Sequence, residues 1–193
     1  MNNILLPAQA TGSLLPKQQE LIVDNFFSLV IAQKLTATTI TMQLYFDQVN
    51  TSDIPMIVDL LKIYLPNVLT TQCFNDDGYS FKEEVRHTEL GHLFEHILLE
   101  YLCQLKMAKG CNKACFSGRT KWNWIRDPKG KFYIHINCGL KDADILPEAI
   151  EKTSQLMRII LSNHQTPLFY LSPEKTANNG LKNGRRTRKT ISA

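Results

Sequence analysis

Apolar and polar residues alternate along several parts of the chain in the period of two that is typical of half-buried strands. Residues 36–46 alternate Ile, Met, Leu and Phe with Thr, Gln and Tyr. Residues 119–126 and 131–138 alternate in the same way around Asp127-Pro128-Lys129-Gly130, which predicts a β-hairpin. The short apolar segment 68–73 predicts a further strand.

Other segments place their apolar residues at helical spacing. A strand over 27–32 is the alternative for part of the first of them. The predicted helices cover residues 17–34, 53–64 with Asp53 as N-cap, 83–106, and 144–162. Strands and helices together predict an α+β fold, in which a small, mostly antiparallel sheet packs against helices as a two-layer sandwich.

Composition and charge divide the chain into three parts. Residues 1–16 suggest an extended lead-in, and residues 17–171 a single α+β domain. Residues 172–193 carry six Lys or Arg and one Glu, a net charge of +5, which leaves residues 1–171 with 16 basic and 17 acidic groups, or −1. We expect this basic segment to be a disordered tail that is either solvated or bound to an anionic partner such as nucleic acid.

The sequence also bounds the location of the protein. No apolar run reaches the roughly 18 residues that a membrane span requires, so we expect no membrane partner. The N-terminus lacks the basic start of a signal peptide. The five cysteines are an odd number, which favours reduced thiols in the cytoplasm. The Cys111-x3-Cys115 pair is a weak zinc signal, and two thiols on a loop are the simpler interpretation. The sequence does not determine the oligomeric state, and an oligomer is compatible with it.

The predicted helix over 83–106 has two distinct faces. One face is apolar, and the opposite face carries imidazole, carboxylate, Leu and Cys side chains where a surface helix would carry solvated charges. We therefore expect the second face to be partly covered too. The apolar face holds Leu90, Leu93, Phe94, Ile97, Tyr101 and Leu105, and the opposite face His92, Glu95, His96, Leu99 and Cys103.

The second face contains His92-Leu93-Phe94-Glu95-His96, an H-x-x-E-H motif. Histidines four residues apart lie one turn apart on a helix and can bind one Zn²⁺. Glu95 lies within a turn of both and is placed to take a proton from water. The motif is the inverted form of the zincin H-E-x-x-H. The alternative is a helix with two hydrogen-bonded structural histidines and a solvated Glu.

The segment from Gly91 to Glu100 resembles the G-H-x-x-E-H-x-x-x-E segment in the N-terminal domain of cyanophycin synthetase. The resemblance extends over roughly residues 36–162 and is sharpest in this motif. Its other features are Cys73, Gly78-Tyr79, Gly118-Arg119-Thr120, the strand over 132–138 and Glu148-Ala149. In that family the domain precedes an ATP-grasp domain and a Mur-ligase-like domain. This chain has neither, so we expect a free-standing relative of the N-terminal domain.

The resemblance implies a function and a site. Some members of the family resemble metal-dependent hydrolases of the Asp–Arg polymer, and the H-x-x-E-H helix also resembles that of pitrilysin-type peptidases. We therefore expect a zinc-dependent, peptidase-like hydrolase with a peptide or a cyanophycin-like polymer as substrate and Glu95 as its catalytic base. In pitrilysin-type enzymes a Glu from a later helix is the third zinc ligand. This implies Glu148, with Glu151 or Glu100 as alternatives, beside His92 and His96.

Three basic residues near the predicted hairpin are candidates for binding the substrate. From their positions, Arg119, Lys121 and His135 are suggested to bind substrate carboxylates or the transition-state oxyanion. Two other functions stay open. One is a non-catalytic module that binds a polymer or a partner, and the other is a protein that binds nucleic acid through its basic tail.

Overall fold

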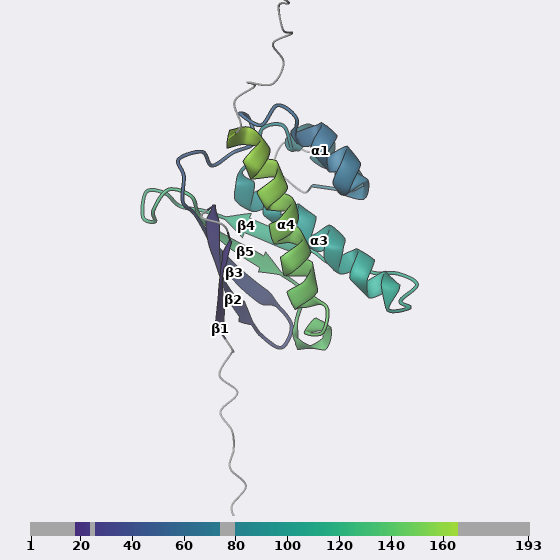
Figure 1. Cartoon of the computed structure of the whole chain (residues 1–193). Coiled ribbons are helices and arrows are strands. Elements are labelled where there is room, and N and C mark those ends of the chain that lie inside the picture. The colour runs from purple at the N-terminus through teal and green to yellow at the C-terminus, as the bar shows by residue number, and fades with distance from the viewer. Residues whose placement is uncertain (1–17, 24–25, 74–79, 166–193) are drawn as a thin grey trace, which may run out of the picture.

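The computed structural model describes residues 18–23, 26–73 and 80–165 (Figure 1). The lead-in predicted over 1–16 and the basic tail predicted over 172–193 lie outside these residues, and the division of the chain into domains stays a prediction. Of the helices in the described part, none is long and apolar enough to span a membrane.

Five antiparallel strands form one sheet, with the order β1-β2-β3-β5-β4. The predicted strand over 36–46 and the predicted hairpin are confirmed, although the first hairpin strand is shorter than expected. The strands are β1 (Gln18–Val23), β2 (Phe27–Gln33), β3 (Thr38–Leu44), β4 (Gly118–Lys121) and β5 (Lys131–Ile136).

The alternation of side chains gives the sheet two different faces. On β3 and β5, every second residue is buried, and the residues between them are only half-buried. Ile40 and Ile134 are paired across the two strands and are completely buried. The other face carries the intervening residues, among them Thr39 and His135, whose side chains are hydrogen-bonded to each other. We call these the inner and the outer face of the sheet.

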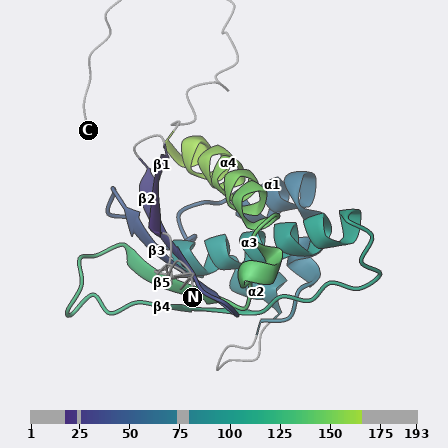
Figure 2. The same cartoon turned by 90° about the horizontal axis from the view of Figure 1, so that it is seen from below.

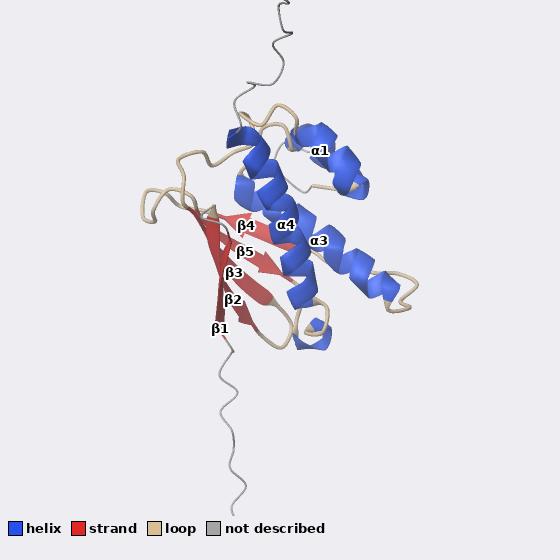
Figure 3. Ribbon diagram, viewed as in Figure 1, coloured by secondary structure: helices blue, strands red, loops and turns tan. Residues whose placement is uncertain are grey.

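The helices gather on the inner face (Figures 2 and 3). They are α1 (Ile57–Tyr64), the single turn α2 (Phe81–Glu84), α3 (Leu90–Ala108) and α4 (Leu146–Gln165). Helices α3 and α4 contact each other, and α3 also contacts β4 and β5. The buried residues of both layers form one hydrophobic core. The predicted α+β, two-layer fold is therefore confirmed.

The helix predicted over 17–34 is wrong, because this segment forms the hairpin of β1 and β2. The alternative, a strand over 27–32, is correct. Phe27 and Leu29 are completely buried, and their strand pairs with β3 along its whole length. Pairing with a neighbouring strand thus outweighs a local apolar spacing that also fits a helix.

The helix predicted over 83–106 is interrupted. Ser80 and Glu83 form a capping box on α2, and α3 begins only at Leu90. Between the two helices the backbone is bonded to a distant segment: Leu90 N donates to Val49 O, and Thr51 N donates to Thr88 O, both at 2.8 Å. These bonds replace the helical bonds that would have continued α2 into α3.

Two smaller predictions also fail. The strand expected over 68–73 is instead the 3-10 helix Pro66–Thr70, which has proline in its first turn. The N-cap of α1 is Met56 rather than Asp53, and no side chain caps this helix. The chain therefore turns tightly after α1, which brings residues 71–73 back toward α3.

Gly91 sets the distance between α3 and the sheet. A Cβ atom at this position would lie 2.4 Å from the ring of Phe132 on β5. No other residue could be placed there without moving the helix or the ring. This close approach holds the first turn of α3 against β5 and positions the residues that follow it.

Candidate metal centre and pocket

Helix α3 has the two faces that its sequence predicts, and both are covered. Leu93, Phe94 and Ile97 are completely buried in the core. On the opposite face, only 4% of Glu95 and 6% of His96 is exposed, and His92 is half-buried. Three titratable groups therefore lie largely out of water.

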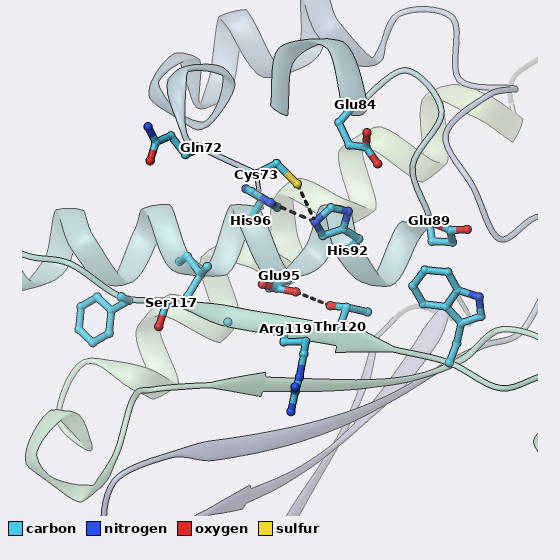
Figure 4. A pocket seen from close by; sticks show the side chains of 14 residues that line it. Gln72, Cys73, Glu84, Glu89, His92, Glu95, His96, Ser117, Arg119 and Thr120 are labelled. Atoms are coloured by element: carbon cyan, nitrogen blue, oxygen red, sulfur yellow. Dashed lines mark hydrogen bonds between the residues drawn. The ribbon is translucent and has the colours of Figure 1, made fainter. Parts of the chain in front are cut away.

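The two histidines face each other through the same ring nitrogen. Their Nε2 atoms lie 3.1 Å apart (Figure 4). The Nδ1 atom of each ring is bound to a threonine hydroxyl: Thr88 Oγ1 lies 2.7 Å from His92 Nδ1, and Thr71 Oγ1 lies 3.1 Å from His96 Nδ1. Such bonds fix the orientation of an imidazole and leave the opposite nitrogen for a ligand.

The hydroxyl of Thr71 determines the tautomer of His96. It donates its proton to Val68 O at 2.7 Å, so it accepts a hydrogen bond from His96 Nδ1. His96 Nε2 therefore presents a lone pair to His92 Nε2. Such a contact requires either a proton on His92 Nε2 or a cation shared by the two nitrogens.

Cys73 adds a third donor. Its Sγ atom lies 3.5 Å from His92 Nε2, and the sulfur and two ring nitrogens of Cys73, His92 and His96 all lie within 4.8 Å of one another. In a tetrahedral zinc site, bond lengths of ~2.05 Å to nitrogen and ~2.3 Å to sulfur place two nitrogens about 3.3 Å apart and nitrogen and sulfur about 3.6 Å apart. The observed distances of 3.1 Å between the two nitrogens and 3.5 Å between Cys73 Sγ and His92 Nε2 are close to these values, and Cys73 Sγ and a ring nitrogen of His96 lie within 4.8 Å of each other. One sulfur and two imidazoles are a donor set that suits zinc.

The ring of Phe81 packs against the ring of His96. The two rings are stacked, with centroids 3.7 Å apart and planes 12° apart. Phe81 itself is completely buried, so this contact restricts the movement of His96. Burial lowers the pKa of both histidines, and together with the neighbouring charge of His92 it lowers the pKa of His96 to about 3. Both rings are therefore neutral at neutral pH, the form that binds metals.

Glu95 lies between α3 and β4. Burial raises its pKa to about 7, although the hydrogen bond from Thr120 acts in the opposite direction. Thr120 Oγ1 donates to Glu95 Oε2 at 2.5 Å. A Cβ atom at position 118 would lie 2.7 Å from Glu95 Oε1, so Gly118 makes room for the carboxylate. A group with this pKa can both take up and release a proton near neutral pH.

His92, Glu95 and His96 share one pocket of about 420 Å³ with Cys73. Glu84, Glu89 and Trp122 also line this pocket, and burial, with a smaller contribution from the charge of Glu84, raises the pKa of Glu89. The pocket is therefore large enough for a few residues of a polymer beside the three possible metal ligands.

None of the carboxylates predicted as third metal ligand lines this pocket. Glu148 and Glu151 lie exposed on α4, where Glu148 pairs with Lys152 at 3.7 Å and Glu151 accepts a hydrogen bond from Gln155. Glu100 accepts a hydrogen bond from Gln104 one turn further along α3. In the described part of the chain, Cys73 takes the place that these carboxylates were expected to fill.

The three basic residues predicted to bind substrate lie on the outer face of the sheet. Arg119 and His135 are paired across β4 and β5, and Lys121 is paired with Tyr133. The Arg119 side chain points away from the histidines (Figure 4). The structure therefore brings together His92, His96 and Glu95, but places the basic side chains on the other side of β4, because strand residues alternate between faces.

Sequence reasoning did not assign a role to Cys73, Thr71, Thr88 or Thr120. Thr88 lies four residues before His92, a spacing that could have indicated the contact within the chain. Cys73 is part of the resemblance, but its 19-residue separation from His92 carries no helical or strand period. Thr71 and Thr120 reach the site only through the tertiary fold.

Part of the chain is similar to a known protein family. Residues 39–123 match the family model described as the cyanophycin synthase-like N-terminal domain. This range includes Cys73, His92, Glu95, His96 and Thr120, so the part of the chain that builds the pocket is similar to that domain. Neither the curated proteins nor the solved structures yield a match.

Proposed function

We propose that this protein is a homologue of the cyanophycin synthase-like N-terminal domain that acts as a zinc-dependent hydrolase on amide bonds of a peptide or a cyanophycin-like polymer. The observation that carries the proposal is the convergence of Cys73 Sγ, His92 Nε2 and His96 Nε2 in a pocket that also contains Glu95. The match of residues 39–123 to the family supports the choice of polymer.

The zinc ion and the side chains of the protein contribute different parts of the proposed hydrolysis. A bound zinc ion lowers the pKa of a water molecule and polarises a carbonyl group. Glu95 takes the proton of the attacking water on its carboxylate and delivers it to the departing amine. Thr120 holds Oε2 of this carboxylate in place. Thr71 and Thr88 keep the imidazoles turned so that both Nε2 atoms point to one position.

The metal is tested first. Protein purified without a histidine tag should contain about one zinc ion per chain by elemental mass spectrometry. Cys73→Ala and His96→Ala should lose it, whereas Cys115→Ser and His87→Gln should keep it, because these two exposed residues lie outside the pocket. Equal zinc content in all five proteins would refute the site.

Hydrolysis is tested separately. Glu95→Gln should retain zinc but cleave the Asp–Arg polymer on the order of 10²–10⁴-fold more slowly, since it has lost its acid–base group. Mass spectrometry of the released fragments measures the rate. Wild-type protein that contains zinc and binds the polymer, but releases no fragments, would instead support a non-catalytic, polymer-binding module.

A further inference from the structure

The pocket follows the edge of a strand. Five consecutive residues, 116–120, line it. Side chains of neighbouring strand residues point to opposite faces of a sheet, so consecutive residues can line one hollow only along their backbone. The pocket is therefore a groove that runs along the edge of β4, with the histidines of α3 on its far side (Figure 4).

Among the residues that the structure describes, no strand lies beside this edge of β4. β4 is an edge strand of the sheet, and β5 is its only strand partner in the described part of the chain. The described residues of β4 form no other backbone–backbone hydrogen bonds. Unpaired N–H and C=O groups along an open edge can pair with an extended peptide.

The outer face next to this edge is basic. Arg119 and Lys121 are both exposed, and neither forms an ion pair with a described residue. By contrast, Lys131 on the same face pairs with Asp127 at 3.4 Å. Burial and the charges of Arg119, Lys121 and Lys34 lower the pKa of His135, which places these positive charges close together.

We propose that an extended, carboxylate-bearing polyamide chain binds as an added strand along β4 and places its acidic side chains on Arg119 and Lys121. Same-face residues of a strand are about 6.8 Å apart, both in β4 and in an added strand, so alternate acidic side chains match these two cations. The intervening residues then point to the side of Thr120, toward Glu95 and the histidines.

The backbone of β4 favours a polyamide over a nucleic acid. Its free N–H and C=O groups pair with amides, whereas a sugar–phosphate chain offers no matching donors. This inference rests on the proposed function in one respect only, namely that the bound polyamide is then hydrolysed. Binding itself is measured on Glu95→Gln protein, so that a failure to hydrolyse and a failure to bind are separate results.

The binding experiment uses three probes of equal length: a capped peptide that alternates Thr with Asp, its Thr–Asn analogue, and single-stranded oligonucleotide. Calorimetry should give tighter binding of the Thr–Asp peptide than of either other probe. The double variant Arg119→Gln/Lys121→Gln should bind it about tenfold more weakly, as expected for the loss of two exposed ion pairs. Lys62→Gln, which changes an ion-paired lysine on α1, should bind it as before.

The pairing of the peptide backbone with β4 is tested separately from the ion pairs. Methylation of alternate backbone nitrogens of the peptide should abolish binding in one register and leave it intact in the other, because an added strand turns every second N–H toward its partner. Hydrogen exchange at residues 118–121 should slow when the peptide binds. Equal binding of the Asn peptide, a preference for the oligonucleotide, or equal effects of both methylation patterns would overturn the proposal.

Discussion

The two faces of helix α3 are both buried, but by different means. Phe94 and Ile97 are covered by apolar side chains. The burial of each of these two residues contributes about 1.5–3 kcal/mol to the stability of the fold. Glu95 and His96 are covered as well, yet each needs a threonine partner to offset the loss of solvent. The apolar face therefore stabilises the fold, whereas the polar face depends on the fold to hold its side chains in position.

This difference separates stability from metal binding. A substitution on the core face should change the free energy of unfolding and leave the affinity of the folded protein for zinc unchanged. A substitution among the threonines should change the affinity for zinc, and should lower the free energy of unfolding by less than a substitution on the core face does. Three predictions test this separation.

The largest effect is expected for Phe94→Ala. Its ring is completely buried and packs edge-on against Phe27 with centroids 6.1 Å apart, so its removal should lower the free energy of unfolding by about 3–5 kcal/mol. Urea unfolding of zinc-free protein measures this, and Phe94→Leu should lose much less. Zinc affinity of the folded variant should match that of the wild type; a loss of affinity as large as that of His96→Ala would mean that the two faces are not separable.

Thr71→Val should weaken zinc binding by about 10–100-fold, because His96 Nδ1 loses its acceptor while the volume of the side chain is kept. Competition with a chelator measures the affinity. Thr70→Val is the matched control, since the hydroxyl of this exposed neighbour donates only to Asn67 O. If both variants bind zinc equally well, the hydroxyl of Thr71 does not orient the ring.

The third prediction, whose effect is spread over several pH units, is a dependence of stability on pH in zinc-free protein. The pKa of His96 falls from 6.5 to about 3 on folding, so stability decreases as the pH falls from 6.5 toward 3. The pKa of Glu95 rises from 4.5 to about 7, so stability increases as the pH falls from 7 to 4.5. Between pH 6.5 and 4.5 the two contributions oppose each other.

Glu95→Gln removes one of these contributions and isolates the other. Relative to the wild type, the variant should gain up to ~1.4 kcal/mol of stability for each pH unit from 4.5 to 7. Urea unfolding at a series of pH values measures this difference, in which the other titrating groups cancel. A difference that is the same at pH 4.5 and pH 8 would show that the carboxyl group keeps its ordinary pKa in the fold.

Much of the fold follows from patterns within the sequence. The strand Thr38–Leu44 and the burial of both faces of α3 follow from the spacing of apolar residues. The relation of His92 to His96 follows from the geometry of one helical turn. Each of these features depends on residues that are close together in the chain, and local periodicity records such relations well.

The remaining features depend on contacts between distant segments. The interruption before Leu90 is fixed by bonds to Val49 and Thr51, which no pattern near residue 90 reveals. Cys73 replaces Glu148 beside the histidines because the chain turns back after Pro66. Arg119 and Lys121 were predicted to bind substrate, and the pleat of β4, which the sequence alone does not position relative to α3, turns them to the outer face of the sheet.

The late start of α3 also has an electrostatic consequence. A helix that began at Glu83 would have its first turn about 10 Å further from His92 along the axis. Because α3 begins at Leu90, His92 lies in the first turn, where aligned peptide dipoles give the equivalent of about half a positive charge. The interruption therefore brings a field that favours negative charge to the place where a thiolate, a hydroxide ion or a substrate carboxylate would bind.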